Sequence, residues 1–465
     1  MLTKSKSVLS DGTRVEDLIN KETREVSMRV LHDRELYELE LEQIFGKTWL
    51  LLAHESEIPK SGDYVVRSMG EDQVIVSRDR EDQVHVMLNV CPHRGMRICM
   101  GEAGNAQVHR CIYHGWAFRP NGEFMGAPIE REQMHGDVFE KSELGLRKAR
   151  VTVYGGLIYA TWNIEGPSFE EFLGEMKWYY DMLFCRTDGG LECVGAPQRF
   201  IVPANWKAAA EQSASDGFHT LTAHRSLMET GIMGNASAED IYANAPGMYG
   251  IDIGSPHGHS LRCIPAELTF SMFMGDTDLK SLSTEERLNM LPPPGIPKEL
   301  VPQLKKHMDP KQYELLAKAP PQVGGMFPNI LIAFIYAPRE DGKYGGALTL
   351  HTYVPKGPDH LEFTNWIFVE KDAPEQMKRD MVANSVRSTG TSGTIEQDDS
   401  DMWPHQSRAA RGVIGREGTL KYGAMLGENK PADWPGGAYV YDGFTKDDTQ
   451  WHWWNYYFDL MTAKS

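Results

Sequence analysis

Two short stretches, CPHRG at residues 91–95 and CIYHGW at residues 111–116, decide how the first part of this chain folds. Each stretch places a cysteine and a histidine within four residues of one another, and 17 residues separate His93 from Cys111. Thiolates and imidazoles are the ligands that zinc and iron prefer in proteins. The spacing therefore predicts a metal centre held on two hairpin-like loops by Cys91, His93, Cys111 and His114.

Two metal groups are compatible with this ligand set. A tetrahedral zinc ion takes two cysteines and two histidines, whereas a [2Fe-2S] cluster can take both thiolates on one iron and both imidazoles on the other. A glycine closely follows each histidine, at Gly95 and Gly115, where backbone N–H groups can approach bridging sulfides. The two stretches resemble the Rieske motif. This resemblance favours the cluster, which passes single electrons and does no substrate chemistry itself.

The sequence around these loops predicts a small all-β domain. β-branched stretches separated by Gly- and Asp-containing turns indicate antiparallel strands, and they cover residues 63–69, 73–78, 83–90 and 151–162. The last stretch is expected to turn at Gly155 and Gly156. We place the boundaries of this domain at residues 46–165.

The rest of the chain predicts a different architecture. Residues 166–465 contain three candidate strands followed by two helical stretches, at residues 329–336, 347–354, 361–369, 374–388 and 394–411. Strands followed by helices indicate an α+β domain, with helices covering an antiparallel sheet. Residues 33–45 have apolar residues at helical spacing with Asp33 as N-cap, and residues 1–45 are expected to pack with this second domain.

A second set of candidate ligands lies in NWKAAAEQSASDGFHTLTAH, residues 205–224. His219 and His224 diverge by about 140° on an ideal helix, so the helix must bend or end if both are to bind one metal. Asp216 lies three residues before His219, where a carboxylate can orient the imidazole. With an aspartate from EQDD (residues 396–399), the two histidines would form the facial triad of non-haem Fe(II) oxygenases. Taken alone, such histidines and acidic runs are more often packing or surface residues.

Composition excludes several classes of function. The 465 residues include 48 Lys and Arg against 65 Asp and Glu, a net charge of −17, which is unsuited to binding nucleic acid or an anionic membrane. The longest apolar run is too short to span a bilayer, and the N-terminus lacks the apolar core of a signal peptide. Six cysteines form no disulfide framework, and we expect a cytoplasmic protein.

Over almost its whole length the chain resembles the large (α) subunit of Rieske non-haem iron aromatic-ring-hydroxylating dioxygenases, of the naphthalene, biphenyl and polycyclic aromatic type. The resemblance extends from IFGKTWLLLAHESEIPKSGDY through both metal loops and residues 205–224 to EQDD. It implies a helix-grip-like catalytic domain, a Rieske [2Fe-2S] cluster and a mononuclear Fe(II) held by His219, His224 and Asp399. It also implies that Asp216 links His219 to His114 of the partner subunit in a trimer, giving electrons a route between subunits.

The reaction implied by the resemblance is O2-dependent cis-dihydroxylation of an aromatic ring. No Gly-rich nucleotide fingerprint follows a strand, so electrons from NAD(P)H are expected to arrive through a separate ferredoxin and reductase. The resemblance also implies a small β subunit and an α3β3 assembly. The aromatic run at residues 451–458 is expected either to make subunit contacts or to pack in the core.

The substrate expected is a neutral mono- to polycyclic aromatic hydrocarbon. Methionines at positions 228, 233, 248, 272, 274 and 326 are expected either to form a flexible apolar pocket wall or to fill an irregular core. Arg225 and Arg262 leave a phthalate-like carboxylate as an alternative substrate. Ser213 stands where a bulky aromatic is common and indicates a roomier pocket, whose lining is expected to include Gln212, Ser213, Phe218, Met228, Met233 and Ile395.

Two other functions stay open on the sequence. A Rieske monooxygenase or demethylase would share both metal sites. A non-catalytic Rieske electron carrier would have no mononuclear iron, which the apparent triad argues against.

Overall fold

The computed structural model describes residues 8–128, 139–229, 250–274, 278–339, 344–424, 426–427, 431, 433–443 and 445–463. The chain forms two compact units. One is Leu41–Phe169, and the other combines Met1–Glu40 with Glu170–Ser465. No helix within the described ranges is both long enough and apolar enough to cross a membrane.

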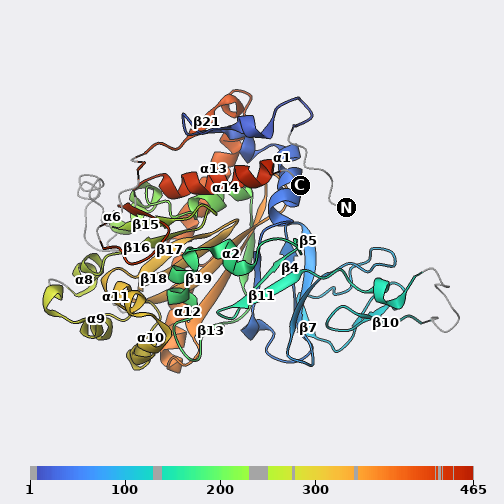
Figure 1. Ribbon diagram of the computed structural model, residues 1–465, viewed down its shortest axis with the longest axis horizontal. Coiled ribbons are helices and arrows are strands. Elements are labelled where there is room, and N and C mark those ends of the chain that lie inside the picture. Colours follow the sequence, from blue (N-terminus) through green and yellow to red (C-terminus); the bar gives the residue numbers. More distant parts are fainter. Residues whose placement is uncertain are drawn as a thin grey trace. The chain divides into compact units, whose positions relative to one another are not determined.

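The unit Leu41–Phe169 is built from antiparallel strands, as the sequence predicts (Figure 1). One sheet has the order β6 (Val84–Leu88), β5 (Asp72–Arg78), β4 (Asp63–Met69) and β7 (Ala103–Asn105). A second has the order β11 (Arg150–Tyr154), β12 (Leu157–Thr161) and β3 (Leu50–His54), and a third has β10 (Phe124–Gly126), β9 (Ala117–Phe118) and β8 (His109–Arg110).

The turn between β11 and β12 confirms the predicted hairpin. Tyr154 pairs with Leu157, so Gly155 and Gly156 form a two-residue loop. Their φ angles are +57° and +82°. Such loops favour glycine because a side chain strains a backbone with positive φ at both central positions.

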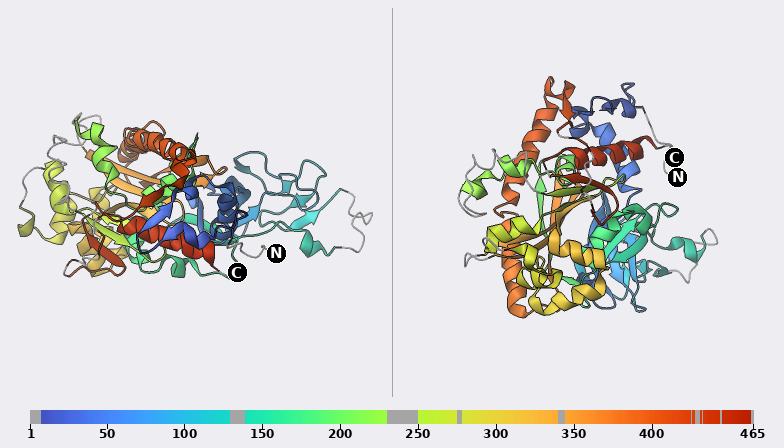
Figure 2. Two further views of the ribbon diagram at one scale, coloured as in Figure 1. Left: turned by 90° about the horizontal axis from the view of Figure 1, so that it is seen from above. Right: turned by 60° about the vertical axis from the view of Figure 1, so that its left-hand side comes forward.

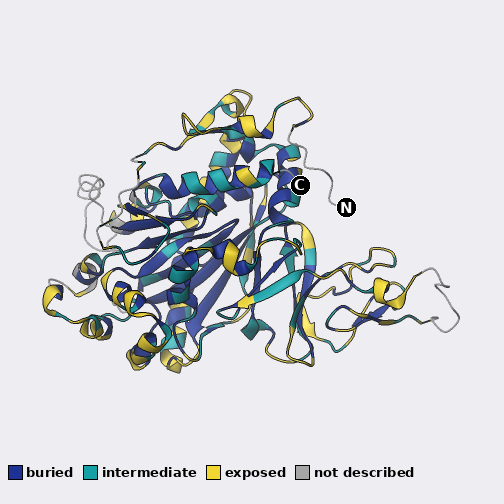
Figure 3. Ribbon diagram, in the orientation of Figure 1, coloured by how far each residue is buried: buried dark blue, intermediate teal, exposed yellow. Residues whose placement is uncertain are grey.

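The second unit is centred on one antiparallel sheet, whose strands Figure 3 shows to be largely buried. Its order is β13 (Leu191–Cys193), β20 (Leu361–Glu370), β19 (Tyr344–Pro355), β18 (Ile330–Pro338), β17 (Pro321–Met326), β16 (Ser260–Cys263), β15 (Ile251–Gly254) and β22 (Tyr439–Asp442), and β14 (Gln198–Val202) also pairs with β20. The three strands predicted from sequence are β18, β19 and β20.

Helices pack on this sheet, which confirms the predicted α+β architecture (Figures 1 and 2). α12 (Glu375–Thr389) contacts β18, β19 and β20, while α4 (Trp206–Gln212) contacts β19, α13 (Glu396–Arg411) and α14 (Asp448–Thr462). The other helices include α3 (Met176–Phe184), α8 (Ala266–Met274), α9 (Thr284–Met290), α10 (Val301–His307) and α11 (Pro310–Lys318). A three-stranded sheet joins β1 (Ile19–Asn20) and β2 (Glu25–Ser27) to β21 (Thr419–Lys421).

The aromatic run near the C-terminus belongs to the core of this unit. It lies on α14, where Trp453, Trp454, Tyr457 and Phe458 are buried. Of the two expected roles, core packing describes these four side chains, because α14 presents them to the interior of its own unit.

A buried polar cluster joins the N-terminal segment, residues 1–40, to the rest of the second unit. Glu40, the last residue of α1 (Arg34–Glu40), accepts hydrogen bonds from Lys207 Nζ at 2.6 Å, Trp206 Nε1 at 2.7 Å and Tyr457 OH at 2.5 Å. The side chains of Glu40 and Lys207 are both fully buried. Burial lowers the pKa of Lys207, although the charge of Glu40 opposes the shift.

Removal of the Glu40 carboxylate should destabilise the fold. Glu40→Ala leaves the Lys207 ammonium buried without its counter-charge, and breaking a buried pair costs about 3–5 kcal/mol of the free energy of unfolding. Urea denaturation followed by circular dichroism measures the loss. The matched control is Glu314→Ala, which breaks an exposed pair with Lys318 and should cost at most about 1 kcal/mol. Equal losses in the two variants would contradict the role given to Glu40.

Candidate metal centres and substrate cavity

Cys91 and Cys111 begin two loops with matching backbone geometry. In the first loop, Cys91 N–H donates to Met96 O at 2.8 Å, and Gly95 N–H donates to Cys91 O at 2.9 Å. The second loop repeats both bonds from Cys111, at 2.8 and 3.0 Å. The glycine after each histidine has a φ of +72° or +73°, the left-handed conformation that favours glycine. The two stretches therefore fold as a pair of equivalent turns.

The side chains of these loops are arranged as a metal centre requires. Cys91 and Cys111 are buried, and the rings of His93 and His114 have centroids 4.6 Å apart. Burial raises the pKa of Cys91 to about 11, so its thiolate needs a bound cation at neutral pH. Two buried cysteines and two neighbouring histidines are the donor set of a [2Fe-2S] cluster with thiolates on one iron and imidazoles on the other.

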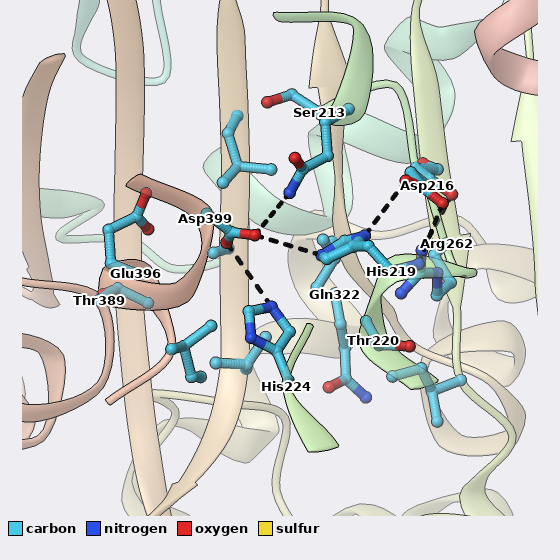
Figure 4. Close-up of a pocket in the computed structure, with 18 of the residues that line it drawn as sticks. Ser213, Asp216, His219, Thr220, His224, Arg262, Gln322, Thr389, Glu396 and Asp399 are labelled. Atoms are coloured by element: carbon cyan, nitrogen blue, oxygen red, sulfur yellow. Dashed lines mark hydrogen bonds and ion pairs between the residues drawn. The ribbon is translucent and has the colours of Figure 1, made fainter. Parts of the chain in front are cut away.

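The second set of ligands does converge on one point. One ligand atom from each of His219, His224 and Asp399 lies within 4.8 Å of the others. Asp399 Oδ1 is 3.8 Å from His219 Nε2, and Asp399 Oδ2 is 3.6 Å from His224 Nε2 (Figure 4). Two imidazoles and one carboxylate, with room for further ligands, are the donor set of mononuclear non-haem iron.

The other nitrogen of each histidine faces a different carboxylate. His219 Nδ1 is 3.4 Å from Asp216 Oδ2, and His224 Nδ1 is 3.2 Å from Asp398 Oδ2. Such carboxylates fix the tautomer and the orientation of a metal-binding imidazole. The sequence predicted this contact for Asp216 but gave no role to Asp398, because the adjacent aspartates were compared only as alternative ligands.

The helix that carries His219 ends before His224. α5 spans His219–Thr222, and His224 follows it and is buried. The required end of the helix therefore lies between the two histidines. A second interruption precedes His219, where α4 ends at Gln212 and Ser215 has a φ of +68°. At this interruption, Asp216 Oδ1 accepts a hydrogen bond from Phe218 N–H at 2.8 Å, which holds the carboxylate beside α5.

Electrostatics at the site favour positive charge on the ring of His219. Burial disfavours the charged form, but the hydrogen bond and charge of Asp216 outweigh it, so the pKa of His219 is raised. Burial also opposes ionisation of Asp216, yet the hydrogen bond and charge of His219 lower the pKa of that carboxyl. The charges of Asp216 and Asp399 beside this ring favour a cation at the site.

Gln212 holds the carboxylate of Asp399 in place. Its Nε2 donates to Asp399 Oδ1 at 2.7 Å, and its Oε1 accepts from Trp403 Nε1 at 2.7 Å. Both ends of the amide are thus engaged, and the carboxylate can turn only if these bonds break.

Loss of the Gln212 amide should therefore weaken iron binding. Gln212→Leu is expected to reduce the affinity of the mononuclear site about 10- to 100-fold, as is typical when a group that orients a metal ligand is removed. Iron titration of metal-depleted protein measures the effect. Ser400→Ala is the control, because Ser400 bonds only its own helix, at Glu396 O. Unchanged affinity in Gln212→Leu would show that Asp399 needs no such support.

A cavity of about 260 Å³ opens beside the triad. Leu331, Ala333 and Ile335 line it from alternate positions of β18, and Val323 lines it from β17. Alternate residues of a strand point to the same face. Glu396 also lines the cavity, and burial, together with the charge of Asp399, raises its pKa well above the usual range. The β17 and β18 side of the wall is therefore largely apolar, and Glu396 adds a carboxyl whose pKa burial raises.

The predicted pocket residues have mixed outcomes. Gln212, Ser213 and Ile395 line the cavity, whereas Phe218 does not. Phe218 directly precedes His219, and neighbouring helical positions lie about 100° apart, so the two side chains leave α5 in different directions. Met233 lies outside the described residues, and so does the side chain of Met228.

The expected methionine-rich wall is absent from the described lining. Met326 is buried in the core, and Met274 is 45% exposed. Met248 and the side chain of Met272 lie outside what the structure describes. Aliphatic residues of β17 and β18 line the described part of the cavity, and their two-residue periodicity was a usable signal. Of the two arginines, Arg262 lines the cavity, whereas Arg225 pairs with Glu229 on the exposed face of its helix, α6 (Arg225–Glu229).

Comparison with known proteins agrees with both parts of the chain. Residues 48–145 match the Rieske [2Fe-2S] domain, and residues 169–429 match the ring hydroxylating alpha subunit (catalytic domain). The chain is 31% identical to the biphenyl dioxygenase subunit alpha of Metapseudomonas furukawaii, covering 94% of this chain and 92% of the relative. It is also 31% identical to the N,N-dimethyl phenylurea N-demethylase subunit alpha of a Sphingobium species, covering 89% and 88%. The structure of naphthalene 1,2-dioxygenase from Rhodococcus sp. bound to indole is similar, with a TM-score of 0.85, 34% identity and 97% coverage of both chains.

Proposed function

Since this chain belongs to the family of ring-hydroxylating dioxygenase α subunits, which carry a Rieske [2Fe-2S] domain and a mononuclear-iron catalytic domain, we propose that it dihydroxylates a neutral mono- to polycyclic aromatic hydrocarbon. Both atoms of O2 would enter the ring as a cis-dihydrodiol. Two electrons and two protons balance the reaction. The convergence of His219, His224 and Asp399 in the lining of a largely apolar cavity is the observation that carries this proposal.

The residues of each centre have separate tasks. Cys91, Cys111, His93 and His114 would hold the [2Fe-2S] cluster, which transfers electrons one at a time. His219, His224 and Asp399 would hold the mononuclear iron, which supplies the activation of dioxygen when bound. Asp216, Asp398 and Gln212 keep these three ligands oriented through the contacts described above.

The cavity favours an uncharged ring. Most of its accessible lining surface is apolar, which suits flat apolar molecules. Arg262 is the only lysine or arginine among the described lining residues. Its Nη2 donates to Ser215 O at 2.9 Å, and its Nε lies 3.7 Å from Asp252 Oδ1. Because Arg262 already contacts Ser215 O and lies beside Asp252, a phthalate-like carboxylate is the weaker alternative substrate.

Electrons would come from NAD(P)H through a reductase and a ferredoxin. The tips of the cluster loops support access by a protein partner, because Ile112 and Tyr113, directly before His114, are 69% and 58% exposed. We further propose an α3β3 assembly with a small β subunit, in which Asp216 connects His219 to His114 of the partner subunit.

Single turnover with labelled dioxygen tests this function. The purified protein would be chemically reduced and mixed with 18O2 and a panel of naphthalene, biphenyl, a larger polycycle and phthalate, with products identified by mass spectrometry. A diol with two labelled atoms from a hydrocarbon is the expected result. Product from phthalate alone would show that the substrate is an aromatic carboxylate and not a hydrocarbon.

One rival reaction has a specific observation in its favour, the similarity to an N-demethylase α subunit. The same assay separates it when N-methyl and methoxy probes join the panel. Product carrying one labelled oxygen would identify the protein as a monooxygenase or demethylase. Loss of a methyl group without any diol from the hydrocarbons would do the same.

A further inference from the structure

Gln322 is a buried amide in the wall of the cavity. It is the second residue of β17 and lines the cavity beside Val323, and only 3% of its surface is exposed. Its Nε2 has no hydrogen-bond partner among the described residues. A buried donor without a partner costs free energy, so a group that bonds it is favoured there.

A β-bulge brings this amide to the cavity. β16 and β17 pair Arg262 with Val323 and Cys263 with Pro321, so the register shifts between them and Gln322 is the extra residue. In a regular strand, two consecutive residues point to opposite faces. The bulge removes that alternation, and both Gln322 and Val323 face the cavity. Bulges often redirect a side chain beside an active site.

Most other polar groups in the wall are already engaged. The hydroxyls of Thr220, Thr269 and Thr389 bond backbone carbonyls, and Ser213 Oγ contacts Ala209 O and Tyr353 OH. Ser215 Oγ and Glu396 Oε1 resemble Gln322 Nε2 in having no hydrogen-bond partner within the described chain, whereas His219 Nδ1 faces Asp216 Oδ2 at 3.4 Å and Arg262 Nε faces Asp252 Oδ1 at 3.7 Å. Ser215 belongs to the turn beside Asp216, and Glu396 lies one helical turn before Asp399, so both belong to the surroundings of the triad.

On its β18 side Gln322 neighbours an apolar stretch, while on its β16 side Arg262 pairs with Val323 and also lines the cavity. Val323 follows it and pairs with Ala333 of β18, and Leu331 and Ile335 flank Ala333 on the same face of that strand. An amide donor in the wall distinguishes substrates by a single atom, because a hydrocarbon leaves the amide unbonded and an acceptor satisfies it.

We propose that Gln322 donates a hydrogen bond from Nε2 to an acceptor atom of the substrate. The enzyme then prefers neutral aromatics that carry one acceptor, such as a ring nitrogen or oxygen or a carbonyl, over hydrocarbons of the same shape. This inference rests on the proposed function and narrows its substrate class. Gln322 is a specificity-determining residue in it and takes no part in the oxygen chemistry.

Competition between two rings of equal shape tests the inference. Quinoline and naphthalene differ by one ring nitrogen, and an equimolar mixture would be oxidised in single turnover by wild type and by Gln322→Met, which keeps the length of the side chain and removes the donor. The quinoline-to-naphthalene product ratio should fall about 10-fold in the variant. Comparing ratios cancels the intrinsic reactivity of each ring and any loss of folded protein.

A matched control keeps the Gln322 amide and changes a different residue of the cavity wall. Leu268→Met alters another lining residue, and its product ratio should stay within about 2-fold of wild type. An unchanged ratio in Gln322→Met, or wild-type diol from naphthalene or biphenyl with none from quinoline, would overturn the inference while the proposed function stands. Diol from no aromatic compound would overturn the proposed function, and this inference with it.

Discussion

His219→Ala is expected to remove the mononuclear iron and lower turnover at least about 1,000-fold, while the visible spectrum of the [2Fe-2S] cluster stays intact. The loss follows from geometry, because His219 Nε2 and His224 Nε2 face the two oxygens of one carboxylate, and the remaining two ligands cannot enclose an ion. The cluster residues belong to a different compact unit of the chain. Iron analysis and labile-sulfide determination measure the effect. The iron content should fall from about three to about two per chain, and both sulfides should be retained.

A histidine elsewhere on the same fold supplies the control. His405 lies on α13, as Asp399 does, but its side chain is 64% exposed and faces Asp401. His405→Ala should keep all of the iron and the wild-type rate. Loss of cluster and mononuclear iron together in His219→Ala would show that the two centres are not independent, and retention of both would remove His219 from the ligand set.

Asp216→Ala is expected to leave both metal centres largely occupied and to slow turnover at least about 100-fold. Asp216 contacts Nδ1 of His219, whereas Asp399 faces Nε2, the other nitrogen of the same ring. Its removal therefore spares the ligand set but interrupts the proposed hydrogen-bonded route from the partner subunit. Stopped-flow measurement of cluster reoxidation by O2, in the presence of substrate, reports the electron transfer directly.

Asp398→Ala distinguishes an electron route from simple support of a ligand. Asp398 contacts His224 Nδ1 as Asp216 contacts that of His219, but the proposed route does not include it. Both variants should lose some affinity for iron, whereas only Asp216→Ala should slow cluster reoxidation in protein reloaded with iron. Equal rates of reoxidation in the two variants would show that Asp216 only orients His219 and is not part of the electron route.

Much of the fold could be predicted because its signals are local. The hairpin at Gly155–Gly156 follows from two residues that tolerate positive φ, and β18, β19 and β20 follow from apolar β-branched runs. The strands at residues 251–254, 260–263 and 321–326 escaped prediction. They are short and include glycines or polar residues, and they are held by their neighbours in the sheet more than by their own composition.

By itself, the sequence determined the local chemistry of this protein: two equivalent Cys/His loops, two histidines beside a helix break, and a nearby aspartate. These features depend on short spacings that the backbone converts into geometry within one turn or loop. Only the tertiary structure decided the rest. It brings Asp398 to His224 across 174 residues, and it builds part of the cavity wall from β17 and β18. A bulge turns Gln322 inward. The direction of a side chain depends on register and packing, and composition alone carries neither.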